Sequence, residues 1–263
     1  MTARAPWLPL LRRLTAVVPD WYVWKNADSA LAGQGDVDSL APRAAWPLIV
    51  AEFRAWARAS ELGPVVVCRH TPGALIVVGS LPSTPTRLLQ LDVYDRAARV
   101  VPAERLVGAS ELDTRGFRRL RPGAEGLLLL LVHARRAGRP PRRLEDLWTV
   151  RRLLSDDPGG AELASEMLGP VGAPAVAGAK AVLADSWSRR AMLGLEPVYA
   201  VGAVRDLRRR ATWLRFKLTR GHRCPVLTAL ASGRVVSEDL GAWLDRVERG
   251  GHAVYGRGDV ADE

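Results

Sequence analysis

Two aspartates separated by one apolar residue, Asp36-Val37-Asp38, constrain the fold of this chain more than any other feature. If the segment is a β-strand, both carboxylates lie on the same face of the sheet, because side chains alternate along a strand with a period of two. Like charges this close repel each other unless a cation lies between them. Gly33 and Gly35 end any helix before the pair. The segment therefore predicts a strand beside a tight turn that can bind a hard metal ion.

A second alternating segment supplies a third carboxylate. In the run Leu89 to Val93, the residues Leu89, Leu91 and Val93 are expected to face a core, and Asp92 to face the other way. The sequence therefore predicts that Asp92 joins Asp36 and Asp38 if the two strands are neighbours. The competing interpretation is that all three are solvated residues of turns or strand ends.

The order of these features resembles the nucleotidyltransferase superfamily with the polymerase-beta-type fold. That family has an apolar strand, a small-residue turn, a short helix, an Asp-x-Asp strand and a third Asp on a later strand. The corresponding segments here are Trp21 to Trp24, the turn Lys25-Asn26, Ala27 to Leu31, and Gly35 to Asp38. The resemblance covers roughly Pro19 to Val93. It departs from the family pattern at Lys25, where Gly is usual, and at Ser39, where a bulky apolar residue is usual.

The resemblance implies a role for each candidate site residue. Asp36 and Asp38 would hold one or two Mg²⁺ ions, and Asp92 would hold the second ion and act as general base for an acceptor hydroxyl. Lys25 and Asn26 would contact the nucleotide phosphates, Lys25 as a point charge. The alternatives for Lys25 are a surface position or an internal ion pair with Asp36.

Other polar residues near these segments have two interpretations each. Asp95 is either a fourth acidic ligand or a turn residue at the end of its strand. Asn26 is a candidate cap for the short helix, with Asp28 and Ser29 as rival caps. His70 adjoins a predicted hairpin turn and is expected to be exposed. The chain has only four His, none at ligand spacing from a Cys, so a zinc site is not expected.

The pattern of the first half predicts an α/β (α+β) fold with a mixed sheet that helices cover mainly on one face. A leading helix with an apolar stripe precedes the strand Trp21 to Trp24, the short helix and the acidic strand. The expected segments after the acidic strand are a helix over Arg43 to Ser60 and strands over Val65 to Arg69, Leu75 to Val78 and Leu88 to Tyr94.

Helix-forming residues dominate after Gly123, so an all-helical second domain is expected. We place the boundary near Arg118, giving an α/β domain over 1–118 and a helical domain over 119–263 whose last residues, 251–263, are frayed. The helices are predicted at Ala124 to Arg136, Leu144 to Leu154, Ala161 to Leu168, Ala175 to Asp185, Val204 to Thr219 and Glu238 to Arg249. Pro140-Pro141, Asp157 to Gly160 and Gly169-Pro170 are expected to separate them.

The charge of the chain allows a polyanionic partner but does not require one. The formal net charge is +10, and only three of the 38 basic residues are lysines, which is the arginine usage of a GC-rich genome. A segment with Arg205, Arg208, Arg209, Arg210, Arg215, Lys217 and Arg220 predicts a basic helix that could bind RNA. No apolar run is long enough to span a membrane, and the two cysteines suit a reducing, cytoplasmic setting.

The leading functional hypothesis is Mg²⁺-dependent transfer of a nucleoside monophosphate from a nucleoside triphosphate to a hydroxyl-bearing acceptor, a small molecule or RNA. Two alternatives remain. The chain is either a catalytically inactive binding protein that keeps the fold, as the Lys25 departure allows, or an RNA-acting nucleotidyltransferase, as the arginine segment allows.

Overall fold

A computed structural model describes most of the first 193 residues and a few short segments after them. The described residues are 7–33, 35–60, 62, 65–68, 73–81, 86–98, 101–134, 144–193, 211, 234–235 and 253–255. His70 and Cys224, and nearly all of the two helices predicted over 204–219 and 238–249, lie outside these ranges.

The order of elements in the first half is the predicted one. After α1 (Trp7–Val17) the chain forms β1 (Tyr22–Lys25), α2 (Ala27–Leu31), β2 (Val37–Leu40), a 3₁₀ turn (Arg43–Ala45), α3 (Trp46–Ala59), β3 (Val65–Cys68), β4 (Ala74–Leu81) and β5 (Thr86–Tyr94). The strands β3 and β4 pair antiparallel, which confirms the predicted hairpin.

Further strands and helices follow β5 in the described part of the chain. In chain order these are β6 (Arg96–Ala97), β7 (Val101–Pro102), a 3₁₀ helix (Ala103–Ala109), β8 (Ser110–Leu112), β9 (Arg118–Leu120), α4 (Pro122–Ala134), α5 (Leu144–Asp156), α6 (Pro158–Met167), a 3₁₀ turn (Gly169–Val171), α7 (Gly172–Leu183), α8 (Arg189–Leu193), β10 (Arg234–Val235) and β11 (Ala253–Tyr255).

The main sheet is mixed, as predicted. Its strand order is β11-β3-β4-β5-β2-β1-β9-β8, and β10 pairs with β5 outside this path. The pairs β2–β5 and β1–β9 are parallel, whereas β1–β2, β3–β4 and β4–β5 are antiparallel. The chain is therefore a mixed α/β protein.

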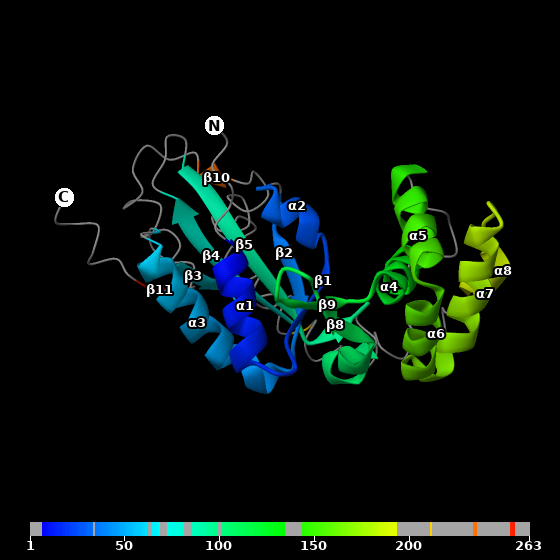
Figure 1. Cartoon of the computed structure of the whole chain (residues 1–263), viewed down its shortest axis with the longest axis horizontal. Coiled ribbons are helices and arrows are strands. Elements are labelled where there is room, and N and C mark those ends of the chain that lie inside the picture. Colours follow the sequence, from blue (N-terminus) through cyan, green and yellow to red (C-terminus); the bar gives the residue numbers. More distant parts are fainter. Residues whose placement is uncertain are drawn as a thin grey trace.

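The helices α1 and α3 cover one face of the sheet (Figure 1). Trp7 of α1 stacks on Trp56 of α3 with ring centroids 5.4 Å apart, and Phe53 meets Trp56 edge to face at 5.1 Å. Leu91 of β5 is fully buried in this core, as the alternating pattern predicted. Burial of three large aromatic rings at one point fixes how the two helices lie on the sheet.

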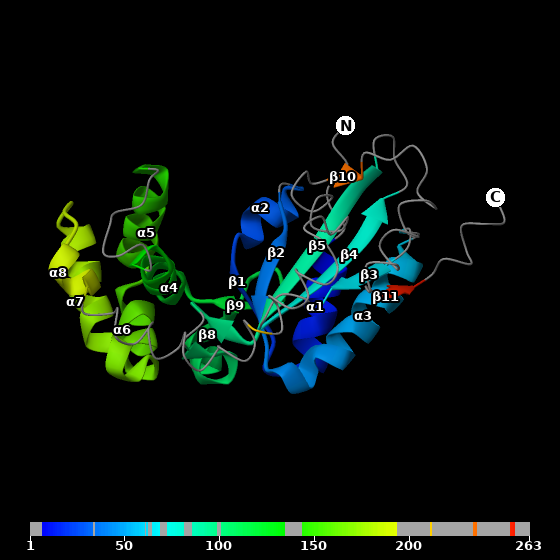
Figure 2. The same ribbon diagram turned by 180° about the vertical axis from the view of Figure 1, so that it is seen from behind.

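The helices α4 to α8 gather beyond the β9–β8 edge of the sheet, as both views show (Figures 1 and 2). Their core continues into the sheet, because Tyr22, Leu40 and Leu120 belong to the same buried cluster as the inner residues of α4 to α7. Close approach of α4 to the start of α6 requires glycine, since a Cβ on Gly123 would lie 1.9 Å from the carbonyl oxygen of Asp157.

The structure corrects three expectations about the second half. Residues 102–116, whose sequence is rich in turn-forming residues and predicts no strand, contain the strand β8, which pairs with β9. Residues Pro158 to Gly160 do not separate helices but form the first turn of α6, capped by the Asp157 side chain, which accepts a bond from the Gly160 N–H. The second half is not all-helical, because β10 pairs with β5 and β11 pairs with β3.

Within the part of the chain that the structure describes, no helix is both long and apolar enough to cross a membrane.

Candidate metal centre

The three candidate aspartates come together at the β2–β5 pair. The two strands run parallel with Asp38 directly opposite Asp92, and Asp36 immediately precedes β2. One carboxylate oxygen from each of the three residues can be chosen so that all three oxygens lie within 4.8 Å of one another. The predicted convergence is therefore observed, and it arises from the parallel register of strands that are distant in sequence.

Lys25 and Asn26 reach the same carboxylate from β1. An irregularity between Val23 and Lys25 shifts the pairing with β2, so that Lys25 lies opposite Asp38. The Lys25 Nζ is 3.1 Å from Asp38 Oδ2, and Asn26 Nδ2 donates to the same oxygen at 3.1 Å. The ion pair of Lys25 is thus with Asp38 and not with Asp36, the partner considered from the sequence. The ammonium also lies 5.0 Å from the centroid of the Trp24 ring.

Asn26 occupies the position where the chain leaves β1 and enters α2. Its backbone has φ 59° and ψ 17°, the left-handed region in which Asn is better tolerated than most residues other than Gly. Its side chain makes no capping bond to α2, because a left-handed residue lacks the extended backbone of an N-cap, and its Nδ2 group donates to Asp38. The rivals considered for the cap, Asp28 and Ser29, lie inside the helix. The Asn26 side chain therefore bonds to Asp38 of the site and does not cap α2.

Asp92 is held by two neighbours on its own strand that sequence reasoning did not single out. Gln90 Nε2 donates to Asp92 Oδ1 at 2.7 Å, and the Tyr94 hydroxyl donates to Asp92 Oδ2 at 3.0 Å. Gln90 Nε2 also lies 3.4 Å from Asp36 Oδ2. The signal that could have identified both residues is their position, two residues before and two after Asp92 on the same face of β5.

Burial and mutual repulsion shape the electrostatics of the site. Burial raises the pKa of Asp92 to about 7, and the charges of Asp38 and Asp36 add to this rise while the bonds from Gln90 and Tyr94 oppose it. Burial likewise raises the pKa of Asp38, and the positive charge of Lys25 offsets only part of that rise. The site thus holds three carboxylates, and among the described side chains Lys25 neutralises part of their charge. A cation binds favourably where negative charge is left in this way.

Asp95 is a structural residue and not a fourth ligand. It lies in the bend after β5, pairs with Arg43 at 2.5 Å from the Arg43 Nε, and is not part of the three-carboxylate group. Ser39, the second departure from the family pattern, is fully buried and donates to the carbonyl oxygen of Asp92 at 2.8 Å. It therefore ties β2 to β5 at the level of the site.

The donor set fits a hard divalent cation. All three candidate ligands are carboxylates, the ligands that Mg²⁺, Ca²⁺ and Mn²⁺ prefer, and no imidazole or thiolate is part of the group. The group could hold a metal ion, and its geometry alone does not select among these metals.

Comparisons of the chain with protein-family models, with curated proteins and with solved structures each give no match. The resemblance to nucleotidyltransferases stays a prediction from the sequence.

Proposed function

We propose that this protein is a Mg²⁺-dependent nucleotidyltransferase that transfers a nucleoside monophosphate from a nucleoside triphosphate to a hydroxyl-bearing acceptor, releasing pyrophosphate. The observation that carries the proposal is the convergence of the carboxylate oxygens of Asp36, Asp38 and Asp92 within 4.8 Å, from two adjacent parallel strands. The element order β1, α2, β2 and later β5 that delivers them is the one expected from the resemblance.

Each residue has a defined task in this proposal. Asp36 and Asp38 hold the metal, which when bound neutralises the charge that develops on the phosphate oxygens. Asp92 completes the ligand set and, as a carboxylate helped by the metal, accepts the proton of the acceptor hydroxyl. Lys25, 28% exposed, can turn its ammonium from Asp38 to a phosphate, and Asn26 orients Asp38.

The proposal gives the two halves of the chain different roles. Residues 1–118 form the nucleotidyltransferase-like part, and the helices α4 to α8 select the acceptor. Their shared core with β1 and β9 keeps the helices at a fixed place beside the sheet.

Two measurements test the proposal. Calorimetric titration of Mg²⁺, alone and with a nonhydrolysable triphosphate, is expected to show coupled binding in the wild-type chain. Pyrophosphate release from each triphosphate with a panel of acceptors is expected to fall by at least ~10³-fold in Asp38→Asn. The matched control is Asp95→Asn, which removes another carboxylate near the end of the same sheet and should leave release nearly unchanged. Activity in Asp38→Asn equal to that of the control would refute the metal role.

One observation favours a second candidate, a binding protein without catalysis. The Lys25 ammonium already lies 3.1 Å from Asp38 Oδ2, where it acts as an internal cation at the position of the family's usual Gly. If this is its role, Mg²⁺ and nucleotide will fail to bind the wild-type chain, and Lys25→Gly will gain Mg²⁺ binding. Tight coupled binding of both ligands to the wild type would exclude this candidate.

A further inference from the structure

Gln90 of β5 lies between two of the three candidate ligands. Its amide nitrogen Nε2 donates to Asp92 Oδ1 at 2.7 Å and lies 3.4 Å from Asp36 Oδ2, so the two N–H bonds of one amide group serve two carboxylates. The orientation of the amide follows from these partners, because a carbonyl oxygen in the same place would face two other acceptors. Gln90 therefore links β5 to the residue that precedes β2 by way of two carboxylates of the site.

The strand register puts Gln90 in this position. Asp38 lies directly opposite Asp92 in the parallel pair β2–β5. Two residues back along both segments, the same register puts Asp36 beside Gln90. The four side chains share one face of the sheet, because side chains alternate along a strand. The bridge is therefore a consequence of the parallel pairing that also gathers the carboxylates.

Asp36 is the least constrained of the three candidate ligands. The strand β2 begins at Val37, so the backbone of Asp36 lies just outside the sheet. Asp36 is half-buried, whereas Asp38 and Asp92 are buried. Among the described side chains, the donor that reaches the Asp36 carboxylate is Gln90. Without that donor, repulsion between like charges would move this carboxylate away from the other two.

The bridging donor is neutral, and this determines its effect on the site. An amide draws two carboxylates together without compensating their charge, so the charge stays available to a cation. Lys25 acts differently at Asp38, because its ammonium, 3.1 Å from Oδ2, offsets part of the charge there. Gln90 thus brings ligands together and leaves their attraction for an ion intact.

We propose that Gln90 is a positioning residue of the metal site, which holds the Asp36 and Asp92 carboxylates at ligand spacing before an ion binds. This role rests on the proposed function and adds to it a residue that does not itself bind the ion. Loss of the hydrogen bonds that orient metal ligands weakens metal binding, because the ligands must then be ordered at the expense of binding energy.

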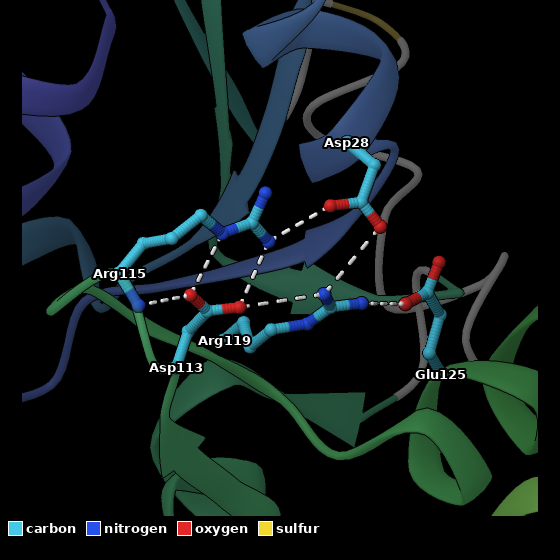
Figure 3. Close-up of polar contacts among 5 residues, drawn as sticks. All are labelled: Asp28, Asp113, Arg115, Arg119 and Glu125. Carbon is cyan, nitrogen blue, oxygen red and sulfur yellow. Dashed lines mark hydrogen bonds and ion pairs between the residues drawn. The ribbon is translucent and has the colours of Figure 1, made fainter.

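The decisive experiment measures the Mg²⁺ affinity of three chains by calorimetry: the wild type, Gln90→Met and Arg115→Ala. Methionine has nearly the length and bulk of glutamine and no N–H donor, so Gln90→Met is expected to weaken binding by about 10- to 100-fold. Arg115→Ala is the control, because Arg115 pairs with Asp28 and Asp113 at 2.8 Å (Figure 3) and neither of these is a candidate ligand. It should lower the thermal midpoint and leave the affinity unchanged.

Two calorimetric results would overturn the positioning role. One is wild-type affinity in Gln90→Met, and the other is an equal loss in Arg115→Ala, since general destabilisation would then explain both. If Gln90→Met does not fold, Gln90→Asn takes its place. Its amide is one methylene shorter and cannot span both carboxylates, so a loss of about 10-fold supports the role and wild-type affinity overturns it.

A readout without metal separates this role from the proposed function. In metal-free crystals of Gln90→Met the Asp36 carboxylate is expected to leave the group of oxygens that lie within 4.8 Å of one another, whereas in Arg115→Ala it should stay. If the wild type binds no Mg²⁺, the proposed function fails, and these crystals alone decide whether Gln90 positions Asp36. An Asp36 carboxylate that keeps its place in Gln90→Met would end the positioning role.

Discussion

Replacing Asp92 by Asn is expected to stabilise the metal-free protein while abolishing its response to metal. Asp92 is 6% exposed, and one of its carboxylate oxygens lies within 4.8 Å of an oxygen of Asp36 and of an oxygen of Asp38. An ionised carboxylate in that place is unfavourable without a cation. The amide of Asn is nearly isosteric, so its oxygen can accept from Gln90 and its NH₂ can donate to the Tyr94 hydroxyl oxygen.

The magnitude follows from the pKa of the carboxyl in the two states. The pKa of Asp92 rises from 3.8 to about 7 on folding. A rise of roughly 3 units means that ionised Asp92 lowers the free energy of unfolding by up to roughly 4 kcal/mol. Because the folded state binds the proton more tightly, this cost is absent below about pH 4, grows between about pH 4 and 7, and is complete above about pH 7.

The assay is thermal unfolding in EDTA of the wild type and Asp92→Asn at several pH values. Allowing for imperfect amide pairing, a gain of about 2 kcal/mol at pH 8 corresponds to a midpoint roughly 4–8 °C above that of the wild type. At pH 4 the two midpoints should nearly coincide. Saturating Mg²⁺ at pH 8 should then raise the midpoint of the wild type and not that of the variant.

Two results would refute the reasoning. One is a variant less stable than the wild type at pH 8, and the other is a difference in midpoint that does not grow with pH. Asp95→Asn is the matched control. Because Asp95 pairs with Arg43, its loss should destabilise the protein at pH 8 and leave the Mg²⁺ response intact.

Two further predictions concern the contact between α4 and α6. Gly123→Ala should lower the free energy of unfolding by roughly 3 kcal/mol in urea titrations, because its Cβ would lie 1.9 Å from the Asp157 carbonyl oxygen. The control is Gly159→Ala, whose Cβ meets nothing closer than Arg121 at 3.6 Å. Its free energy of unfolding should stay within about 1 kcal/mol of wild type. Equal effects of the two would contradict the packing described. Burial alone would raise the pKa of Asp157, but bonds from Arg121, Gly160 and Gly123 leave it lowered. The stability that ionised Asp157 contributes is therefore present above about pH 4 and lost as pH falls through its folded pKa, so Asp157→Asn should cost about 1 kcal/mol at pH 7 and progressively less below pH 4. A cost that persists at pH 2 would show that the charge is not its source.

Local pattern determined much of the architecture around the site. Alternation at Leu89, Leu91 and Val93 is enough to place Asp92 on the opposite face of its strand, because the period of side chains in a strand does not depend on neighbours. Gly33 and Gly35 likewise placed Asp36 and Asp38 beside a tight turn, and α2 occupies the residues that the family resemblance implied for it, Ala27–Leu31. These inferences hold because each uses residues close together in sequence.

The contacts that give the site its chemistry were decided by the tertiary structure. No local signal specifies that β2 runs parallel to β5 with Asp38 opposite Asp92, or that a shifted register brings Lys25 to Asp38. Strand register and helix docking are selected by the burial of whole apolar faces, to which every residue of those faces contributes. The sequence by itself therefore determined which carboxylates were available and on which kind of element, and only the packed sheet and helices decided which groups surround them.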